Sequence, residues 1–146
     1  MARVLAVCIS EKKGVRKHAV DEIRLAVGLG IEGDAHAGNW HRQVSLLGQE
    51  SVDTMRARGL TLTPGAFAEN IVTEGLTLRA LPVGTLLQAG EALLCVTQIG
   101  KECHNDCAIK KTAGMCVMPT DGVFAVVVRG GVVRPGDEIT IREEQP

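Results

Sequence analysis

The chain has 146 residues, of which 45% are hydrophobic and 23% are charged, and this combination predicts a single compact domain covering residues 1–146. The 16 basic residues are balanced by 17 acidic ones, and aromatic residues make up only 2% of the chain. The chain therefore lacks the excess positive charge and the aromatic stacking surface that nucleic-acid-binding proteins use, and we expect no nucleic-acid partner. No apolar run approaches the ~18 residues that span a bilayer and no signal-peptide pattern is present, so we expect a cytoplasmic protein without a membrane partner.

The first half of the chain is predicted to form strands, a loop and one helix. Branched apolar side chains and partial apolar–polar alternation favour the strands. A glycine-rich run is unsuited to any regular element and predicts a shaped loop. The helix is favoured where Val52 and Met55 share one face ahead of Gly59, which can end it. In chain order the predicted elements are strands at 3–10 and 20–27, the loop at 30–39, a strand at 42–47 and the helix at 49–58.

The second half of the chain predicts only short strands at close spacing. Apolar pieces alternate with turn residues, and glycine accounts for 17 of the 146 residues. Many short strands with few helices favour a mainly β fold that wraps into a closed or nearly closed barrel, because closure removes exposed strand edges. The predicted strands lie at 70–73, 85–88, 92–98, 123–129 and 137–142.

The five cysteines divide into two groups. Cys8 and Cys95 lie within apolar stretches, where a free thiol usually behaves as a small buried hydrophobic group. Cys103, Cys107 and Cys116 cluster in one segment after the strand at 92–98. An odd number of cysteines without a secretory signal is a poor basis for a disulfide framework, so the cluster points to reactive or metal-binding thiols.

Cys103 is the candidate nucleophile or metal ligand. It follows the end of a predicted strand on a loop, where a thiol is accessible, and Lys101 and His104 are near it in the sequence. A neighbouring positive charge lowers a thiol pKa and favours the reactive thiolate. Adjacent residues of an extended chain can point in opposite directions, so the structure has to decide whether these charges reach the sulfur.

Zinc binding is a competing interpretation of the same segment. Cys103, His104, Cys107 and Cys116 together supply enough sulfur and nitrogen ligands for a tetrahedral zinc ion. No C-x2-C pair is present, however, and the spacings do not match those of iron–sulfur proteins. Inert thiols are the third alternative.

Two polar features outside the cysteine segment can also serve a site. Asp34 and His36 lie among glycines that permit a close approach of the backbone to a ligand. An equally good interpretation is that Asp34 closes a turn and His36 is a solvated surface residue. Glu69 and Asn70 enter an apolar strand, where a polar pair must find partners or face a pocket; a structural role is favoured for them.

Taken together, these residues resemble the MOSC domain, the family named after the C-terminal part of molybdenum cofactor sulfurase. The resemblance covers nearly the whole chain, with the order and spacing of several motifs in agreement. The end of the chain is similar to a short standalone subgroup. The matching motifs are residues 30–38 (GIEGDAHAG), 42–47 (RQVSLL), 67–71 (FAENI), 76–84, 99–104 (IGKECH), 116–119 (CVMP), 122–125 (GVFA) and Gly130–Gly131.

The resemblance implies a mainly β barrel of the MOSC, pyruvate-kinase-barrel-like type, and a cysteine that carries sulfur or coordinates the metal of the molybdenum cofactor. Cys103 matches that cysteine, as persulfide carrier or metal ligand, and Cys107 or Cys116 can then act as a resolving thiol. The implied partners are a pyridoxal-phosphate cysteine desulfurase as sulfur donor and a molybdenum or tungsten enzyme as recipient. The residues implied to hold phosphate or polar pterin groups are Asp34, His36, Arg42, Asn70, Lys101 and His104.

Three functions therefore stay open at this point. The leading one is a sulfur-carrier or molybdenum/tungsten-pterin-binding module in metallocofactor maturation, with no cofactor needed for folding. The second is a self-contained sulfur transferase or cysteine-dependent lyase that acts on a small molecule, with Cys103 as nucleophile and Lys101 or His104 as acid–base partner. The third is a zinc-stabilised domain that recruits another protein.

Overall fold

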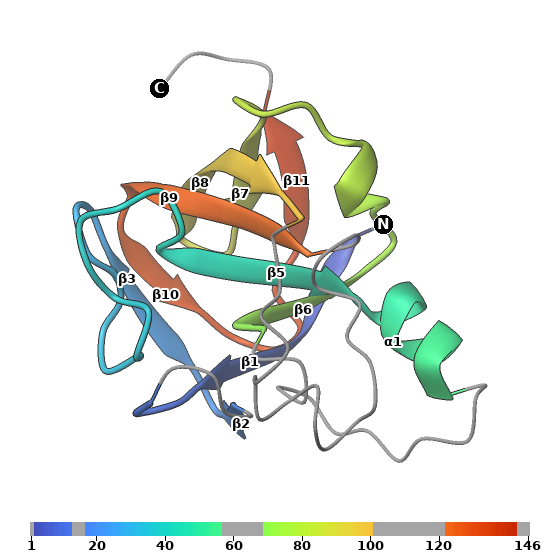
Figure 1. Ribbon diagram of the computed structural model, residues 1–146, viewed down its shortest axis with the longest axis horizontal. Coiled ribbons are helices and arrows are strands. Elements are labelled where there is room, and N and C mark those ends of the chain that lie inside the picture. Colours follow the sequence, from blue (N-terminus) through green and yellow to red (C-terminus); the bar gives the residue numbers. More distant parts are fainter. Residues whose placement is uncertain (1, 13–16, 57–68, 101–121, 143–146) are drawn as a thin grey trace.

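Strands dominate the structure and are joined into two sheets (Figure 1). The computed structural model describes residues 2–12, 17–56, 69–100 and 122–142, and the side chains of residues 54–56 are outside this description. The strands are β1 (Arg3–Ile9), β2 (His18–Val20), β3 (Ile23–Ala26), β4 (Gly30–Ile31), β5 (Val44–Gly48), β6 (Ile71–Glu74), β7 (Leu86–Ala89), β8 (Ala92–Ile99), β9 (Val123–Arg129), β10 (Gly131–Val133) and β11 (Ile139–Arg142), and the helical segments are α1 (Gln49–Arg56) and the 3-10 turn η1 (Leu78–Ala80).

The larger sheet has eight strands in the order β11-β7-β8-β9-β5-β6-β1-β2, and the smaller sheet has the order β10-β3-β4. Figure 1 shows the smaller sheet on one side of the molecule and α1 on the other. Among the described residues, no helix has the length and apolar character needed to cross a membrane. The mainly β fold predicted from the sequence is confirmed.

Strand β5 lies near the middle of the larger sheet and is buried at all five of its residues. It pairs antiparallel with β9, where Ser45 is opposite Phe124, and parallel with β6, where Leu46 is opposite Ile71. A strand that is covered on both faces needs an almost continuous apolar sequence, which Val44–Gly48 supplies. This strand therefore holds the chain on either side of it in a fixed position.

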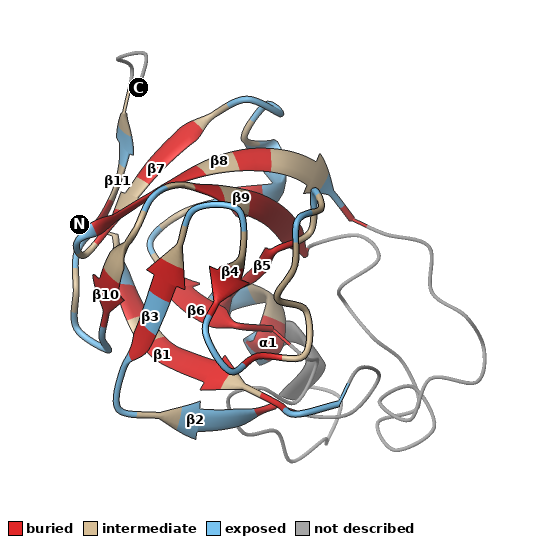
Figure 2. Cartoon of the chain, turned by 90° about the vertical axis from the view of Figure 1, so that its left-hand side faces the viewer, coloured by how far each residue is buried: buried red, intermediate tan, exposed pale blue. Residues whose placement is uncertain are grey.

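The core takes side chains from both sheets. Val4, Ile23, Leu46 and Val133 belong to one cluster of buried residues, although they come from four different strands. Figure 2 shows most of the buried positions on the strands, with exposed residues mainly in the connections and on β2. Full burial of one such aliphatic side chain contributes about 1.5–3 kcal/mol, so this shared cluster is the main attraction between the sheets.

The ends of the larger sheet bear on the predicted barrel. The strand order is open and ends at β11 and β2, so a closed ladder is not found among the described residues. Backbone bonds nevertheless join the start of β1 to the residues before β11. Val4 N donates to Asp137 O, and Gly136 N donates to Val4 O, both at 2.7 Å. These bonds bring the two regions together without a continuous ladder, and full closure stays a prediction.

Most of the predicted elements are confirmed, with shifts of one or two residues at their ends. The expected strand at 20–27 is wrong as a single element, because the exposed pair Asp21 and Glu22 interrupts it and the pieces on either side pair with different strands. The expected loop at 30–39 begins with a two-residue strand, β4. The sequence interpretation missed β10 and η1, and the proposed helix stop at Gly59 lies outside the described residues.

Candidate functional site

The glycine-rich loop between β4 and β5 is folded back onto the end of β1. Ala35 N donates to Ser10 O at 2.8 Å, and Gly38 N donates to Leu29 O at 2.6 Å. Gly30, in β4 just before the loop, has a φ of 103°, and a Cβ there would lie 2.8 Å from the Gln43 carbonyl oxygen. Only glycine fits such a close backbone approach at positive φ, so the sequence of the loop sets its path.

Asp34 anchors this loop from inside. Its Oδ1 accepts hydrogen bonds from the Lys17 ammonium at 2.7 Å and from Ser10 N at 3.1 Å, and its Oδ2 accepts one from His36 N at 3.1 Å. Neither the Asp34 nor the Lys17 side chain has any exposed surface. The carboxylate is therefore committed to contacts within the protein.

Opposing effects act on the pKa values of this pair. Burial alone would raise the pKa of Asp34, but the neighbouring His36, the hydrogen bond and charge of Lys17, and the Ser10 amide together hold it well below its usual range. Burial lowers the pKa of Lys17, and the hydrogen bond and charge of Asp34 oppose this shift. We conclude that the carboxylate of Asp34 is ionised throughout the neutral range.

His36, Trp40 and Arg42 form a stacked series along the outer part of the loop. The rings of His36 and Trp40 are nearly parallel, with centroids 6.3 Å apart, and Trp40 Nε1 donates to His36 O at 2.8 Å. The Arg42 guanidinium carbon lies 4.7 Å from the Trp40 ring centroid and 5.6 Å from that of Phe124. Arg42 Nε is buried without a hydrogen-bond partner among the described residues. The Arg42 cation is thus held between two rings, and its buried Nε–H makes no hydrogen bond within the described part of the chain.

The same region holds both ends of the segment that contains Cys103. His41 Nε2 donates to Gln98 Oε1 at 2.8 Å, and Gln98 Nε2 donates to Gly100 O at 2.8 Å. Gly100 N in turn donates to Gly122 O at 2.6 Å. The chain therefore leaves β8 and returns to β9 beside the loop that carries Arg42.

Asn70 is part of the framework behind the loop. Its Oδ1 accepts bonds from Ser45 N and Ser45 Oγ, both at 3.0 Å, and its Nδ2 donates to Cys8 O at 3.0 Å. The residue is fully buried, and Glu69 beside it is 1% exposed. Asn70 thus links β1, β5 and the start of β6 through its side chain.

The two isolated cysteines differ in burial. Cys8 is fully buried, as expected, and its pKa is raised to about 12 by burial and by the nearby Glu69 charge, against a smaller lowering by Lys17. Cys95 is only half-buried, which is less than its apolar surroundings predict.

The predicted catalytic cluster lies outside the described residues. This holds for Lys101, Cys103, His104, Cys107 and Cys116, and with them for the zinc interpretation and for Cys103 as a metal ligand. Within the described part of the chain, no group of three or more potential ligand side chains is close enough to hold a metal ion. The structure brings together Asp34, His36 and Arg42, with Asn70 on the strands behind.

Lys17 and Trp40 are the main site residues that the sequence interpretation missed. Lys17 follows several charged and polar residues and has the pattern of an exposed lysine, yet it is 3% exposed. A weak signal existed for Trp40, because it is the chain's single tryptophan and directly follows the glycine loop.

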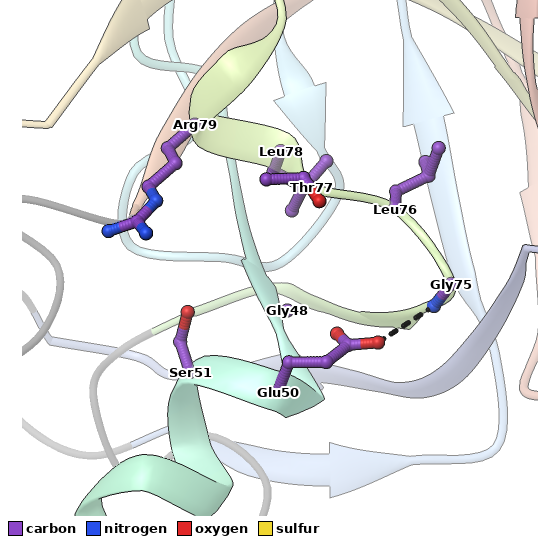
Figure 3. Close-up of a pocket in the computed structure, with 8 residues that line it drawn as sticks. All are labelled: Gly48, Glu50, Ser51, Gly75, Leu76, Thr77, Leu78 and Arg79. Atoms are coloured by element: carbon purple, nitrogen blue, oxygen red, sulfur yellow. Dashed lines mark hydrogen bonds between the residues drawn. The ribbon is translucent and has the colours of Figure 1, made fainter.

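A cavity of about 620 Å³ lies away from these residues, between the start of α1 and the turn after β6. Figure 3 shows Ser51 and Arg79 at one end of it, whereas the Glu50 carboxylate points to Gly75 N and accepts a hydrogen bond at 3.0 Å. None of the site residues predicted from the sequence lines this cavity.

A family model decides the relationship of the chain to known proteins. The model of the MOSC domain matches residues 33–140, which include the loop, β5 and the segment after β8. The chain belongs to the MOSC domain family. This family is associated with functions similar to that of molybdenum cofactor sulfurase. No curated protein matches the sequence of this MOSC domain at a significant level.

Solved structures agree with the family assignment. YuaD from Bacillus subtilis superimposes with a TM-score of 0.77 at 21% identity, over 99% of this chain and 98% of that one. YiiM from Geobacillus stearothermophilus superimposes with a TM-score of 0.75 at 22% identity, over 98% of this chain and 76% of that one. YiiM from Escherichia coli superimposes with a TM-score of 0.67 at 22% identity, over 98% of this chain and 71% of that one. At these identities the likeness concerns the fold.

Proposed function

We propose that this MOSC domain is a sulfur-carrier or molybdenum/tungsten-pterin-binding module in metallocofactor maturation, with Cys103 as persulfide carrier or metal-binding thiolate. One observation carries the proposal. The hydrogen bonds from His41 through Gln98 to Gly100 hold the start of the cysteine segment beside the loop that presents His36 and Arg42. A thiolate and a set of hydrogen-bond donors can therefore serve one ligand.

Cys103 follows Gly100 by only three residues, which limits how far Cys103 can be from Gly100. Consecutive Cα atoms are about 3.8 Å apart, so the Cα of Cys103 lies within about 11 Å of that of Gly100 in any conformation. This reach is compatible with a ligand that contacts Arg42 at one end and the thiol at the other.

The donors suit an anionic group of a pterin cofactor. Arg42 Nε is buried without a partner in the described part of the chain, and leaving such a group unsatisfied costs about 1–3 kcal/mol, more where the group is charged. A phosphate oxygen would relieve this cost, and guanidinium groups match phosphate geometry well. Asp34 and Asn70 would support the site from behind through their internal bonds. When bound, the cofactor supplies a soft metal centre that accepts sulfur ligands.

The sulfur-transfer step balances without an external oxidant. The Cys103 thiolate attacks the terminal sulfur of a persulfide on a cysteine desulfurase, which forms a new S–S bond on Cys103 and breaks the donor's S–S bond. The donor cysteine leaves as a thiolate. Lys101 and His104 would favour the thiolate form of Cys103. If the sulfur is not passed on, the thiolate of Cys107 or Cys116 would attack Sγ of the Cys103 persulfide, which forms a disulfide with Cys103, breaks the persulfide S–S bond and releases hydrosulfide.

Mass spectrometry tests this proposal. The full chain is incubated with a cysteine desulfurase and cysteine, and each cysteine-containing peptide is examined for one added sulfur atom. We expect the addition on Cys103, its loss in Cys103→Ser and its retention in the matched variant Cys95→Ser. Added sulfur only on other cysteines, or none at all, contradicts the carrier role. Retention of a pterin by the wild-type chain and its loss in Arg42→Gln would then separate cofactor binding from sulfur transfer.

A further inference from the structure

The buried ammonium of Lys17 has a complete set of acceptors. Its Nζ lies 2.7 Å from Asp34 Oδ1, 3.0 Å from His36 Nδ1 and 3.4 Å from Ser10 Oγ. An ammonium group has three N–H donors and no acceptor, so each of these contacts uses one of its protons.

The three groups around Lys17 Nζ determine which nitrogen of His36 carries the ring proton. Asp34 Oδ1 can only accept, because the carboxylate is ionised. Ser10 Oγ donates its own hydrogen bond to Lys12 O at 3.0 Å and therefore accepts from Lys17. His36 Nδ1 lies 3.0 Å from the Lys17 ammonium and 3.8 Å from Asp34 Oδ2, so only the ammonium is within hydrogen-bond distance, and Nδ1 offers its lone pair to it. The ring proton of neutral His36 is then on Nε2, the other nitrogen of the imidazole.

We propose that Lys17 is a positioning residue that fixes His36 as the Nε2–H tautomer, so that His36 meets the ligand of the site as a hydrogen-bond donor. The His36 side chain is 22% exposed, whereas Lys17 is fully buried, so Lys17 acts on the ligand only through the histidine. The inference rests on the proposed function for the location of the ligand. It narrows the ligand's chemistry to an acceptor, such as a phosphate or another oxyanion, at the position of His36.

Histidine tautomers are measured directly by nitrogen-15 NMR of the full chain, without any ligand. We expect His36 to show a protonated Nε2 and an unprotonated Nδ1 as one fixed form, assigned by the loss of its signals in His36→Gln. The exposed His18 is the internal reference and should show exchange between tautomers. A His36 that carries its proton on Nδ1, or that exchanges like His18, overturns the proposal.

The role of Lys17 is tested by Lys17→Met against Lys12→Met, because Lys12 is exposed. Lys17→Met should release His36 into exchange between tautomers and speed its acylation by diethyl pyrocarbonate about tenfold, since a hydrogen bond to a charged group is lost. Lys12→Met should leave both measurements unchanged. An unchanged His36 in folded Lys17→Met contradicts the role of Lys17. If thermal melting shows that Lys17→Met does not fold, the same two measurements are made on the double variant Lys17→Met, Asp34→Asn, which removes both charges of the buried pair.

The outcomes separate this inference from the proposed function. A fixed Nε2–H tautomer together with no sulfur on Cys103 supports the positioning role and contradicts the carrier role. A His36 that exchanges between tautomers, together with added sulfur on Cys103, contradicts the positioning role and supports the carrier role. Addition of inorganic phosphate should shift the His36 Nε2 signal in the wild-type chain and not in Arg42→Gln, and the absence of any shift in the wild type contradicts the donor role toward oxyanions.

Discussion

The Lys17 ammonium lies 2.7 Å from Asp34 Oδ1, and neither side chain has any surface in contact with solvent. Removing two charges from water is costly, and the cost is met here by a close pair in which every donor of the ammonium and both oxygens of the carboxylate have partners. The pair connects the end of β1 with the loop that carries His36. The stability of the fold and the shape of the candidate site therefore depend on the same interaction.

Breaking this pair from one side should destabilise the protein strongly. Lys17→Met leaves the Asp34 carboxylate buried without its cation, and we expect a loss of about 3–5 kcal/mol in the free energy of unfolding. Urea denaturation measures the change. The control is Glu22→Gln at the exposed pair with Arg134, which should cost less than about 1 kcal/mol. The double variant Lys17→Met, Asp34→Asn should regain part of the loss, and equal costs for Lys17→Met and the control would contradict the role of the pair.

Asp34 also makes stability dependent on acid pH. Its pKa is lowered in the folded state, so below the ordinary carboxyl value of about 3.9 the unfolded chain binds a proton that the folded chain does not. This contribution is complete above about pH 5 and decreases as the pH falls, with a slope of up to about 1.4 kcal/mol per pH unit. Urea denaturation between pH 5 and 2 should show a shallower slope for Asp34→Asn than for the wild type. Parallel slopes would show that Asp34 is not the titrating group.

Much of the fold could be predicted from the sequence because the strand signals are strong where burial is continuous. β9 coincides with its predicted range, 123–129, since its first six residues are apolar and four of them are valine, which favours a buried strand. β10 was missed because Gly130 and Gly131 look like a turn; in the structure a Cβ at Gly131 would lie 2.6 Å from the Glu91 Cβ. Such a close approach between segments cannot be seen in one sequence.

The candidate site was less predictable, because its geometry depends on contacts between distant segments. Asp34 and His36 attract attention as polar residues among glycines, but the burial of Lys17 requires the loop to fold over the end of β1. The proximity of Arg42 to Phe124 likewise follows from the pairing of β5 with β9, in which Ser45 is opposite Phe124. Sequence spacing contains neither fact.

Asn70 should be far more important for stability than an exposed amide. Asn70→Ala removes the acceptor for Ser45 N and the donor to Cys8 O in a fully buried place, and we expect a loss of about 2–4 kcal/mol in the free energy of unfolding. Gln49→Ala is the matched control, because its amide makes an exposed hydrogen bond to Asp53, and the change should alter stability by less than about 0.5 kcal/mol. Similar values for both variants in urea denaturation would contradict the proposed link between strands.

Two glycines, one in β4 and one in the loop after it, separate backbone strain from steric contact. Gly30 and Gly33 both have positive φ, but a Cβ at Gly30 would meet Gln43 at 2.8 Å, whereas one at Gly33 would have open space. Gly33→Ala should cost about 1–2 kcal/mol from the backbone conformation alone. Gly30→Ala should cost about 1–3 kcal/mol more, since the strand beside it must move. Thermal or urea unfolding of the two variants measures the difference. Equal losses in the free energy of unfolding would show that the backbone near Gly30 moves to accommodate a Cβ at no added cost.

Cys8 should stay unreactive in the folded protein, which makes it an internal reference for thiol chemistry at Cys103. Burial and the Glu69 charge raise the pKa of Cys8 to about 12, so at pH 8 only about one molecule in 10⁴ has the thiolate there. Iodoacetamide should therefore label Cys8 only after unfolding in urea, and the half-buried Cys95 should be labelled before it. Peptide mass spectrometry over a time course measures both rates. Rapid labelling of Cys8 in the native chain would show that the region between β1 and Asn70 opens, and Cys8 would then compete with Cys103 as an acceptor of sulfur.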